Sequence, residues 1–269
     1  MRQSRNDEPT GGALVQIEAA NVSVCWVTQE EAEQIKRNYQ HAQAVEDLKA
    51  AYIKILQRTD FKSLFDGFEE LSGVFLPCPA ESYFESSPRV MIVGQQTKGW
   101  RNKLCNLRNK RVVDDAGILA SMYHTQTFAR RGAKQSAFMQ FYRKASGRFC
   151  PGARDAAIWS NQFCLSYKSG SPTELPTDAF KTVATLSYDL LKAQIEILQP
   201  DVVIFTTGPD RDKYIKECFP EYETVEILEP RRLWHFRVGG IHCFRISHPR
   251  WVAGTKYLNK AIELAKAHA

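Results

Sequence analysis

Residues Val90–Trp100 read VMIVGQQTKGW, and this stretch decides both the fold and the kind of site that the chain carries. Four apolar residues in succession are typical of a strand that is buried on both faces, as in a parallel sheet covered by helices. The run then ends in a glycine, two glutamines, a threonine and a lysine. A strand end rich in amides is either a polar turn without a function or the floor of a ligand site.

Further apolar runs at wide spacing predict the remaining strands of the same sheet. The four strand-like segments are Arg89–Gly94 (RVMIVG), Ala156–Phe163 (AAIWSNQF), Asp201–Gly208 (DVVIFTTG) and His242–His248 (HCFRISH). Residues Lys181–Leu198 show helical periodicity and end before Pro200, and Lys256–Ala269 would form the last helix. This alternation predicts an α/β fold of three layers, α/β/α, with a central four-stranded parallel sheet.

The N-terminal third of the chain has a different character. Residues 1–12 are polar and predict a flexible tail. Thr28 and Glu31 form a capping-box pattern, and no glycine or proline interrupts the chain from there to Arg58, which predicts one long helix. We therefore expect a tail and helical arm over residues 1–84, packed on an α/β domain over residues 85–269.

Composition narrows the class of protein. The chain has 269 residues, of which 43% are hydrophobic and 25% charged, as in ordinary globular domains. It shows no signal peptide and no apolar run long enough for a membrane span, so we expect a cytoplasmic protein that does not contact membranes. The seven cysteines are scattered without a C-x-x-C pair, which favours reduced thiols, although spacing alone does not exclude an iron–sulfur cluster. No metal, cofactor or obligate protein partner is expected.

Positive charge is concentrated in two stretches, although the net charge is only +6. Lys98–Arg111 (KGWRNKLCNLRNKR) contains no acidic residue, and Phe128–Arg148 interleaves basic with aromatic residues. Basic and aromatic side chains together suit phosphate contacts and base stacking in nucleic-acid binding. The alternative is a solvated basic face without a partner.

The predicted strands all end in polar residues. In an open parallel sheet the ligand binds outside the carboxyl ends of the strands. These ends supply amides, hydroxyls and one imidazole, from Gly94–Thr97, Ser160–Gln162, Thr206–Gly208 and Ser247–Trp251. They contain neither a dinucleotide fingerprint nor a P-loop, whereas side-chain amides match the donors and acceptors of a nucleobase edge.

In their order along the chain, these segments resemble the uracil-DNA glycosylase superfamily. Its members carry G-Q-D-P-Y or G-x-N-P-G after the first strand, an asparagine within the second, L-x-P-x-V-V-V-x-x-x-G at the third and H-P-S-P-L-S at the last. The corresponding segments here read VGQQTKGW, IWSNQFCLSYKSGSP, LQPDVVIFTTG and ISHPRW. The resemblance covers residues 85–265 approximately.

The resemblance implies roles for individual residues. Asn161 would read the Watson–Crick edge of a flipped base, His248 would donate to the base carbonyl, and Gln96 would stand at the water, which makes these three the expected catalytic residues. The base pocket would be formed by Gly94, Gln95, Thr97, Lys98 and Ser160. Double-stranded DNA would be bound by Arg101, Lys103, Arg108, Ser247, Arg250 and Trp251, with Arg250, Trp251 or Val252 as the wedge left in the duplex.

Two departures from the family pattern bear on activity and substrate. Gln96 stands where the best-known branch of the superfamily has an aspartate that activates water. Gln96 would hold the water by hydrogen bonds alone, or Asp114 or Asp115 would supply the missing acid. Lys98 stands where a tyrosine excludes substituents at C5 of uracil. An open C5 side favours a modified pyrimidine, such as the hydroxymethylated or glucosylated cytosine of phage DNA that a related antiviral-defence glycosylase attacks.

The expected function is thus a monofunctional DNA glycosylase that flips a C5-modified pyrimidine and leaves an abasic site. The alternatives are a uracil or mismatch glycosylase of base-excision repair, a catalytically silent DNA-binding member, and an unrelated α/β nucleotide-binding protein. Individual residues also have structural explanations: Asn161 could satisfy a loop backbone, His248 could belong to a turn, and Gln95 and Gln96 could cap a helix.

Overall fold

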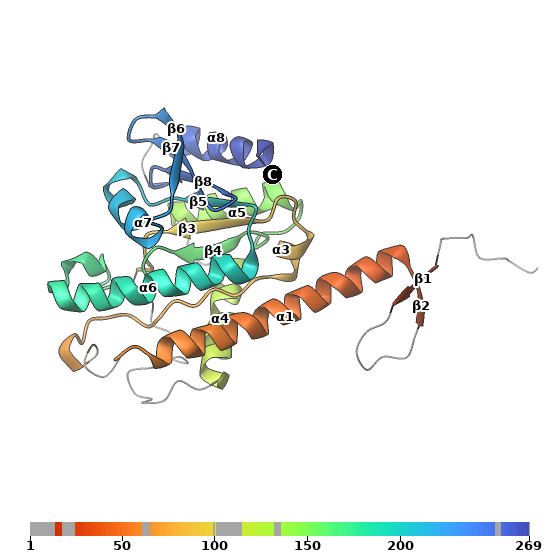
Figure 1. Cartoon of the computed structure of the whole chain (residues 1–269), viewed down its shortest axis with the longest axis horizontal. Helices are drawn as coiled ribbons and strands as arrows, with labels where there is room; N and C mark the ends of the chain where they lie inside the picture. Colours follow the sequence, from red (N-terminus) through yellow and green to blue (C-terminus); the bar gives the residue numbers. More distant parts are fainter. Residues whose placement is uncertain are drawn as a thin grey trace, which may run out of the picture.

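A computed structural model describes residues 14–17, 25–60, 64, 66–98, 100, 115–131, 136–250 and 254–268. A six-stranded sheet forms its centre and has the order β4-β3-β5-β8-β7-β6, and a separate hairpin, β1-β2, precedes the first helix (Figure 1). The strands are β1 (Leu14–Ile17), β2 (Cys25–Thr28), β3 (Val90–Gly94), β4 (Ile158–Asn161), β5 (Val202–Phe205), β6 (Glu223–Glu229), β7 (Leu233–Val238) and β8 (Ile241–Ile246). The helices are α1 (Gln29–Gln57), α3 (Glu81–Glu85), α4 (Asp115–Arg131), α5 (Ala137–Phe149), α6 (Thr177–Leu198), α7 (Asp212–Cys218) and α8 (Gly254–Ala267), with short 3-10 turns η1 (Pro172–Glu174) and η2 (Pro209–Arg211).

The sheet is mixed. Strands β4, β3, β5 and β8 run parallel to one another, and β3 lies between β4 and β5 with Met91 opposite both Ile158 and Val203. Strands β7 and β6 then continue the sheet in antiparallel fashion. The prediction of a four-stranded parallel sheet was therefore incomplete, because it missed this hairpin. Strand β6 is an exposed edge with a glutamate at every third position (Glu223, Glu226 and Glu229), so it lacks the unbroken apolar run that marks the buried strands.

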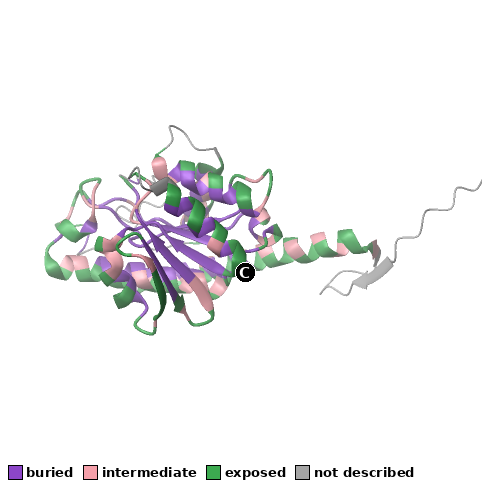
Figure 2. Cartoon of the chain, turned by 90° about the horizontal axis from the view of Figure 1, so that it is seen from above, coloured by how far each residue is buried: buried purple, intermediate pink, exposed green. Residues whose placement is uncertain are grey.

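Helices cover both faces of the sheet, as the alternation along β3 makes clear. Met91 and Val93 belong to a core cluster with buried residues of α1 and α6. Val90 and Ile92 belong to a second cluster with buried residues of α5 and α8. Successive residues of a strand point to opposite faces, so the two clusters lie on opposite sides of the sheet. Figure 2 shows the buried strands between the two sets of helices.

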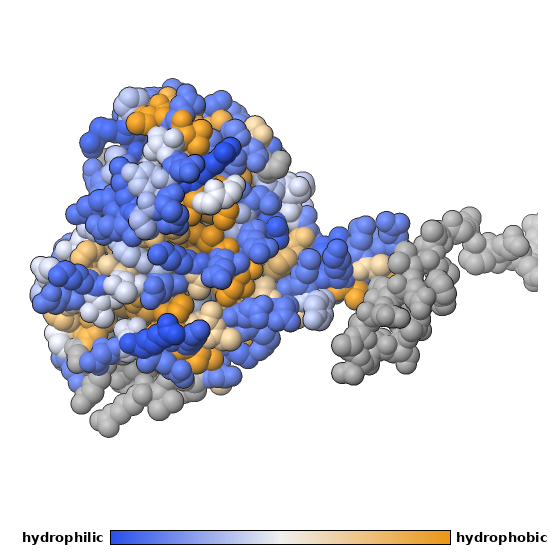
Figure 3. All heavy atoms as spheres, viewed as in Figure 1, coloured by the Kyte–Doolittle hydropathy of each residue, from blue (hydrophilic) through white to orange (hydrophobic). Residues whose placement is uncertain are grey.

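The long N-terminal helix begins where its capping box predicts. The Glu31 N–H donates to Oγ1 of Thr28 at 3.2 Å, and the Thr28 N–H donates to Oε2 of Glu31 at 2.8 Å. Its carboxyl-terminal half is buried from Ala44 to Leu56 at positions of helical spacing, whereas its amino-terminal half projects from the body as a largely hydrophilic arm (Figures 1 and 3). Within the described residues, no helix has both the length and the apolarity needed to cross a membrane.

Candidate functional site

Two neighbouring strand ends are held in register at the carboxyl edge of the sheet. Gly94, the last residue of β3, lies opposite Asn161, the last residue of β4. The pairing continues beyond both strands, because the N–H of Gln162 donates to the Gly94 carbonyl at 2.8 Å and that of Phe163 to the Gln95 carbonyl at 2.9 Å. The amide-rich segment after β3 is thereby fixed against the asparagine of β4.

Gly94 leaves room for the Asn161 side chain. A Cβ atom at position 94 would lie 2.6 Å from Oδ1 of Asn161 and 3.2 Å from Cε2 of Phe138 on α5. Carbon and oxygen atoms do not approach so closely without displacement, so any larger residue would push the amide or the phenyl ring aside. Gly94 is thus needed because the side chains of Asn161 and Phe138 approach its Cα closely, and not because the backbone has a special conformation there.

Asn161 presents a free amide donor. Its side chain is buried, with 6% exposed, and its Oδ1 accepts a long hydrogen bond from the indole Nε1 of Trp159 at 3.4 Å. Its Nδ2 atom has no hydrogen-bond partner among the described residues. A buried amide donor without a partner costs about 1–3 kcal/mol, and such exceptions call for an explanation such as a ligand acceptor. The alternative, that Asn161 satisfies a loop backbone, has no support in these contacts.

An aromatic cluster stands beside this amide. The Phe138 ring lies 5.6 Å from that of Trp159 and nearly parallel to that of Tyr142, and Phe128 lies 5.8 Å from Trp159. Phe138 is only partly buried and touches the position where Gly94 meets Asn161. Sequence reasoning noted aromatic residues in this stretch but missed the role of Phe138, because only the fold brings the start of α5 to the strand ends.

The glutamines after β3 bind neighbouring loops. Gln95 donates from Nε2 to the Thr207 carbonyl at 2.7 Å and so ties the end of β3 to the end of β5. Gln96 accepts a hydrogen bond at Oε1 from Nη2 of Arg211 at 3.3 Å. Neither contact is a helix cap. Both glutamines instead connect the edge of the sheet to the segment that follows β5.

Arg211, which sequence analysis did not single out, is a partly buried cation at this edge. Its Nη2 also donates to Oγ of Ser171 at 2.9 Å, and its guanidinium lies over the rings of Phe163 and Tyr214. Its Nη1 has no hydrogen-bond partner within the described part of the chain. Burial lowers the pKa of this guanidinium. A buried guanidinium with a free donor is suited to an anionic group.

His248, on the loop after β8, is held as a neutral imidazole. Its Nδ1 accepts a hydrogen bond from the Arg250 N–H at 3.1 Å, so the proton of the neutral ring belongs on Nε2. Burial, with a smaller contribution from the charge of Arg250, lowers the pKa of His248 to about 4. The ring therefore offers an Nε2–H donor at neutral pH. His248 does belong to a turn, and the hydrogen bond within that turn also fixes the tautomer of its ring.

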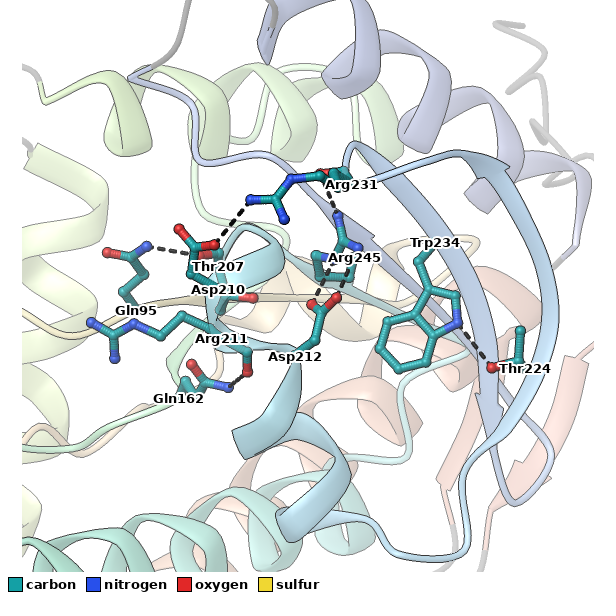
Figure 4. A network of polar contacts seen from close by, with 10 residues as sticks. All are labelled: Gln95, Gln162, Thr207, Asp210, Arg211, Asp212, Thr224, Arg231, Trp234 and Arg245. Carbon is teal, nitrogen blue, oxygen red and sulfur yellow. Dashed lines mark hydrogen bonds and ion pairs between the residues drawn. The ribbon is translucent and has the colours of Figure 1, made fainter. Parts of the chain in front are cut away.

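A cavity of about 500 Å³ opens beside His248, between the loops that follow β5 and β6 and the residues that follow β8. Its lining is formed by Gln95, Thr207, Gly208, Pro209, Asp210, Arg211, Pro230, Arg231, Arg232, Ser247 and His248. The three arginines outnumber the one carboxylate, Asp210, which pairs with Arg231 at 3.3 Å (Figure 4). The cavity is thus cationic, and it lies at the edge where parallel sheets bind ligands.

A buried ion pair supports one wall of the cavity. Nε of Arg245 lies 2.7 Å from Oδ1 of Asp212, and its Nη2 donates to Oδ2 at 2.9 Å. Its Nη1 donates to the Arg231 carbonyl at 3.1 Å, at a residue whose φ is +59°. Figure 4 shows Arg245 between α7 and the β6-β7 turn, so this side chain fixes the backbone from which Arg231 extends.

Asn161 and His248 stand on either side of two strands. They follow β4 and β8, with β3 and β5 between them, so their backbones are separated by three interstrand spacings, about 14 Å. Asn161 and Gln96 do not line the cavity described above, whereas Gln95, Ser247 and His248 do.

Other predicted site residues are placed less favourably. Ser160 donates from Oγ to Gln194 of α6 at 2.6 Å, so its hydroxyl is directed to that helix, and its place in the base pocket stays a prediction. Thr97 is buried with a free Oγ1, whereas Lys98 is exposed. Asp115 begins α4 and is 4.0 Å from Lys49 of α1, and it is not part of the cavity lining.

Several predictions fall on residues outside the described ranges. These are the DNA-binding residues Arg101, Lys103, Arg108 and Trp251, the wedge candidate Val252, and the alternative acid Asp114. Arg250 is described and is exposed at the surface. Comparison of the sequence with protein-family models and with curated proteins gives no match.

Proposed function

We propose that the chain is a DNA glycosylase that flips a pyrimidine out of the duplex and hydrolyses its N-glycosidic bond, which leaves an abasic site. One observation carries this proposal: a buried asparagine with an unused amide donor ends β4, and a neutral histidine follows β8 at the same carboxyl edge of the sheet. An amide suits the hydrogen-bonding edge of a base, and a neutral imidazole suits a carbonyl that gains negative charge.

The chemistry follows from the two side chains. Nδ2 of Asn161 donates to an acceptor on the base edge, such as N3 of cytosine or O4 of uracil, while Phe138 offers a ring for stacking. As the glycosidic bond breaks, electrons move onto the base and the sugar becomes oxocarbenium-like. The Nε2–H of His248 stabilises the anionic carbonyl oxygen of the leaving base. A low pKa is an advantage here, because the donor needs no protonation beforehand.

Water must then attack the sugar, and two groups are placed to orient it. Gln96 already accepts from Arg211, but its amide N–H₂ remains able to bind water. Asp210 lines the cavity as a carboxylate and is held by Arg231. Because a carboxylate accepts protons and an amide does not, we assign the water-orienting role first to Asp210 and then to Gln96.

A C5-modified pyrimidine is the substrate that we propose, with hydroxymethylated or glucosylated cytosine of phage DNA in the cytoplasm as the specific case. Lys98, at the position of the family's excluding tyrosine, is exposed, and Thr97 beside it has a free hydroxyl. An open wall with hydrogen-bonding groups tolerates a substituent that a tyrosine rejects. Uracil in DNA is the alternative substrate.

A second candidate function is DNA binding without cleavage. The observation in its favour is the hydrogen bond between Gln96 and Arg211, which places a neutral amide and a cation where the resembled family has a water-activating acid. In that case the cationic cavity would hold a flipped or single-stranded nucleotide without breaking it.

The test is base excision from defined duplexes. The full chain is incubated with duplexes that contain uracil, 5-hydroxymethyluracil, hydroxymethylcytosine or glucosylated hydroxymethylcytosine, and alkali then reveals abasic sites as strand breaks. Breaks with the modified bases support the proposed substrate, and breaks with uracil alone overturn it. Salt-dependent binding without any breaks points to the silent candidate.

Matched variants separate the site from general damage to the protein. Asn161→Ala and His248→Ala should each lower excision by at least about 100-fold, the scale of losing one electrostatic donor to a transition state. Asn259→Ala removes an exposed asparagine of α8 that accepts a hydrogen bond from Lys144 of α5, and His41→Ala removes a histidine that contacts the Pro79 carbonyl. Both controls should retain full activity. Full activity of both site variants would show that the site has been assigned wrongly.

A further inference from the structure

Three of the six histidines gather in one place, far from the candidate site. His235 comes from β7, His242 from the start of β8 and His268 from the end of the last helix. One ring nitrogen from each lies within 4.8 Å of those of the other two. His242 and His248 stand at opposite ends of β8, and six residues of strand span about 20 Å. The cluster therefore serves a purpose separate from base excision.

The burial of the three rings is graded from the core to the surface. His235 is buried, with 4% exposed, His242 is partly buried and His268 is exposed. The rings of His242 and His268 are stacked with centroids 4.4 Å apart, and those of His235 and His242 are 5.1 Å apart. The buried His235 ring is thus rigid, whereas the exposed His268 ring can rotate and leaves the cluster accessible from solvent.

The hydrogen bonds define which nitrogens carry protons. Arg237 is always a donor, so its contact of 3.3 Å to Nε2 of His242 makes that nitrogen an acceptor. The proton of His242 therefore lies on Nδ1, which donates to Nε2 of His235 at 2.9 Å. Burial lowers the pKa of His235 to about 4 and also lowers that of His242, with the neighbouring histidines and Arg237 adding to both effects. These hydrogen bonds require an unprotonated nitrogen on the rings of His235 and His242, and a neutral imidazole is the form that binds metals.

From this geometry we propose that His235, His242 and His268 bind a divalent transition-metal ion of the zinc class through three imidazole nitrogens, with solvent as the fourth ligand. The donor set contains nitrogen and no carboxylate, which suits zinc, nickel, cobalt or copper and not magnesium or calcium.

Occupancy requires a small rearrangement that the chain allows. Zinc–nitrogen bonds of about 2.0–2.1 Å in tetrahedral geometry separate the ligand nitrogens by about 3.3 Å, so the pair of inner rings opens slightly and His268 moves inward. The proton on Nδ1 of His242 moves through solvent to Nε2 of the same ring, so no net proton is lost. Arg237 is exposed and can turn away from that nitrogen. The ion would fasten the end of α8 to β7 and β8.

The test uses the full chain without a histidine tag. After treatment with a chelator and its removal, the protein is titrated with zinc chloride by calorimetry, and its thermal unfolding is followed in parallel. We expect one site per chain and a melting temperature that rises with the zinc concentration, because the ion binds the folded state. His268→Gln, which changes an exposed residue, should weaken binding by at least about tenfold. His242→Gln should do the same, and His41→Gln on α1 should bind zinc as the parent does.

Two results would overturn the proposal: no saturable binding to the parent chain, or equal binding by the parent and His268→Gln. X-ray absorption distinguishes the histidines from the seven cysteines. Nitrogen neighbours at about 2.0 Å support the site, whereas a sulfur shell at about 2.3 Å places the ion elsewhere and overturns it.

Discussion

Gly94 shows how a single missing side chain shapes the candidate site. Its neighbour across the sheet, Asn161, reaches over the space where a Cβ would be and is held there by the indole of Trp159. The free Nδ2 that results is the feature on which the proposed reading of a base by Asn161 depends. The Asn161 amide can take this position only because Gly94, the residue beneath it, has no side chain.

Gly94→Ala should therefore abolish excision while the fold remains. The added methyl group would lie 2.6 Å from Oδ1 of Asn161 and so displace the amide from the position that meets a base. We expect a fall of at least about 100-fold in the single-turnover rate, because an amide out of place loses its contact in the transition state. Gly240→Ala, which has open space around it, is the matched control. Equal activity of the two variants would contradict the role of Asn161.

The low pKa of His248 predicts an unusual pH profile. An imidazole in the unfolded chain titrates near 6.5, whereas that of folded His248 titrates at about 4. The folded state thus binds fewer protons between these values, and stability falls as the pH is lowered through this window. His235, whose pKa is also lowered to about 4, adds to the effect. Because the neutral ring is the donor, the excision rate should stay level from pH 8 to 5 and fall only near pH 4. A rate that halves near pH 6.5 would argue against a neutral His248.

At the scale of elements, the segment from β5 to α7 carries much of the site. It leaves the sheet at Thr207, turns through η2 and begins α7 at Asp212. Its contacts to Gln95, Gln96 and Arg245 bind it to the segment after β3 and to β8. The cavity wall is thus stable only as long as these long-range contacts form together.

Arg245→Leu should destabilise the protein and loosen this wall. Removal of one partner from a buried ion pair costs about 3–5 kcal/mol, since Asp212 keeps its charge without its partner. The Arg231 carbonyl would lose its donor as well. Urea unfolding measures the change, and Lys181→Ala is the comparison, because its exposed pair with Asp178 is worth less than about 1 kcal/mol. Equal stability of the two variants would show that the wall does not depend on Arg245.

For the whole molecule, apolar patterning was enough to predict the four strand segments that became β3, β4, β5 and β8, and the helices α6 and α8, but not α4, α5 or α7. Strand β3 shows why: its buried residues are consecutive and both of its faces are covered. The β6-β7 hairpin was missed because β6 is an exposed edge with a glutamate at every third position, and Pro230 with two arginines separates it from β7. The position of each strand end, and hence of Asn161 and His248, could be predicted because parallel strands end at one edge.

Contacts between distant segments could not be predicted in the same way. Arg211 and Gln96 are distant in the sequence and come into contact only because β3 and β5 are neighbours in the sheet. Phe138 reaches Gly94 because α5 packs back on the sheet, and Ser160 turned out to serve α6. The histidine cluster has no motif spacing, since its members come from a hairpin and a terminal helix. In each case the contacting residue is brought close by the tertiary fold, and the neighbouring sequence does not indicate it.

The distribution of charge over the molecule predicts how DNA binding responds to salt. Arg232 lines the cationic cavity, so Arg232→Ala should lower the slope of log affinity against log salt by about 1, the contribution of one phosphate contact. Lys192, an exposed residue near the end of α6 at the opposite edge of the sheet, is the control and should leave the slope unchanged as Lys192→Ala. Equal slopes for the two variants would place the DNA on another surface.

The most direct measurement of the central claim is mass spectrometry of the free base released from DNA that contains glucosylated hydroxymethylcytosine. Incubation with the full chain should release the modified base and leave an equal amount of abasic sites, and Asn161→Ala or His248→Ala should reduce both to background. Release of uracil alone from a matched uracil duplex would contradict the proposed substrate. No free base from either DNA would contradict the glycosylase itself.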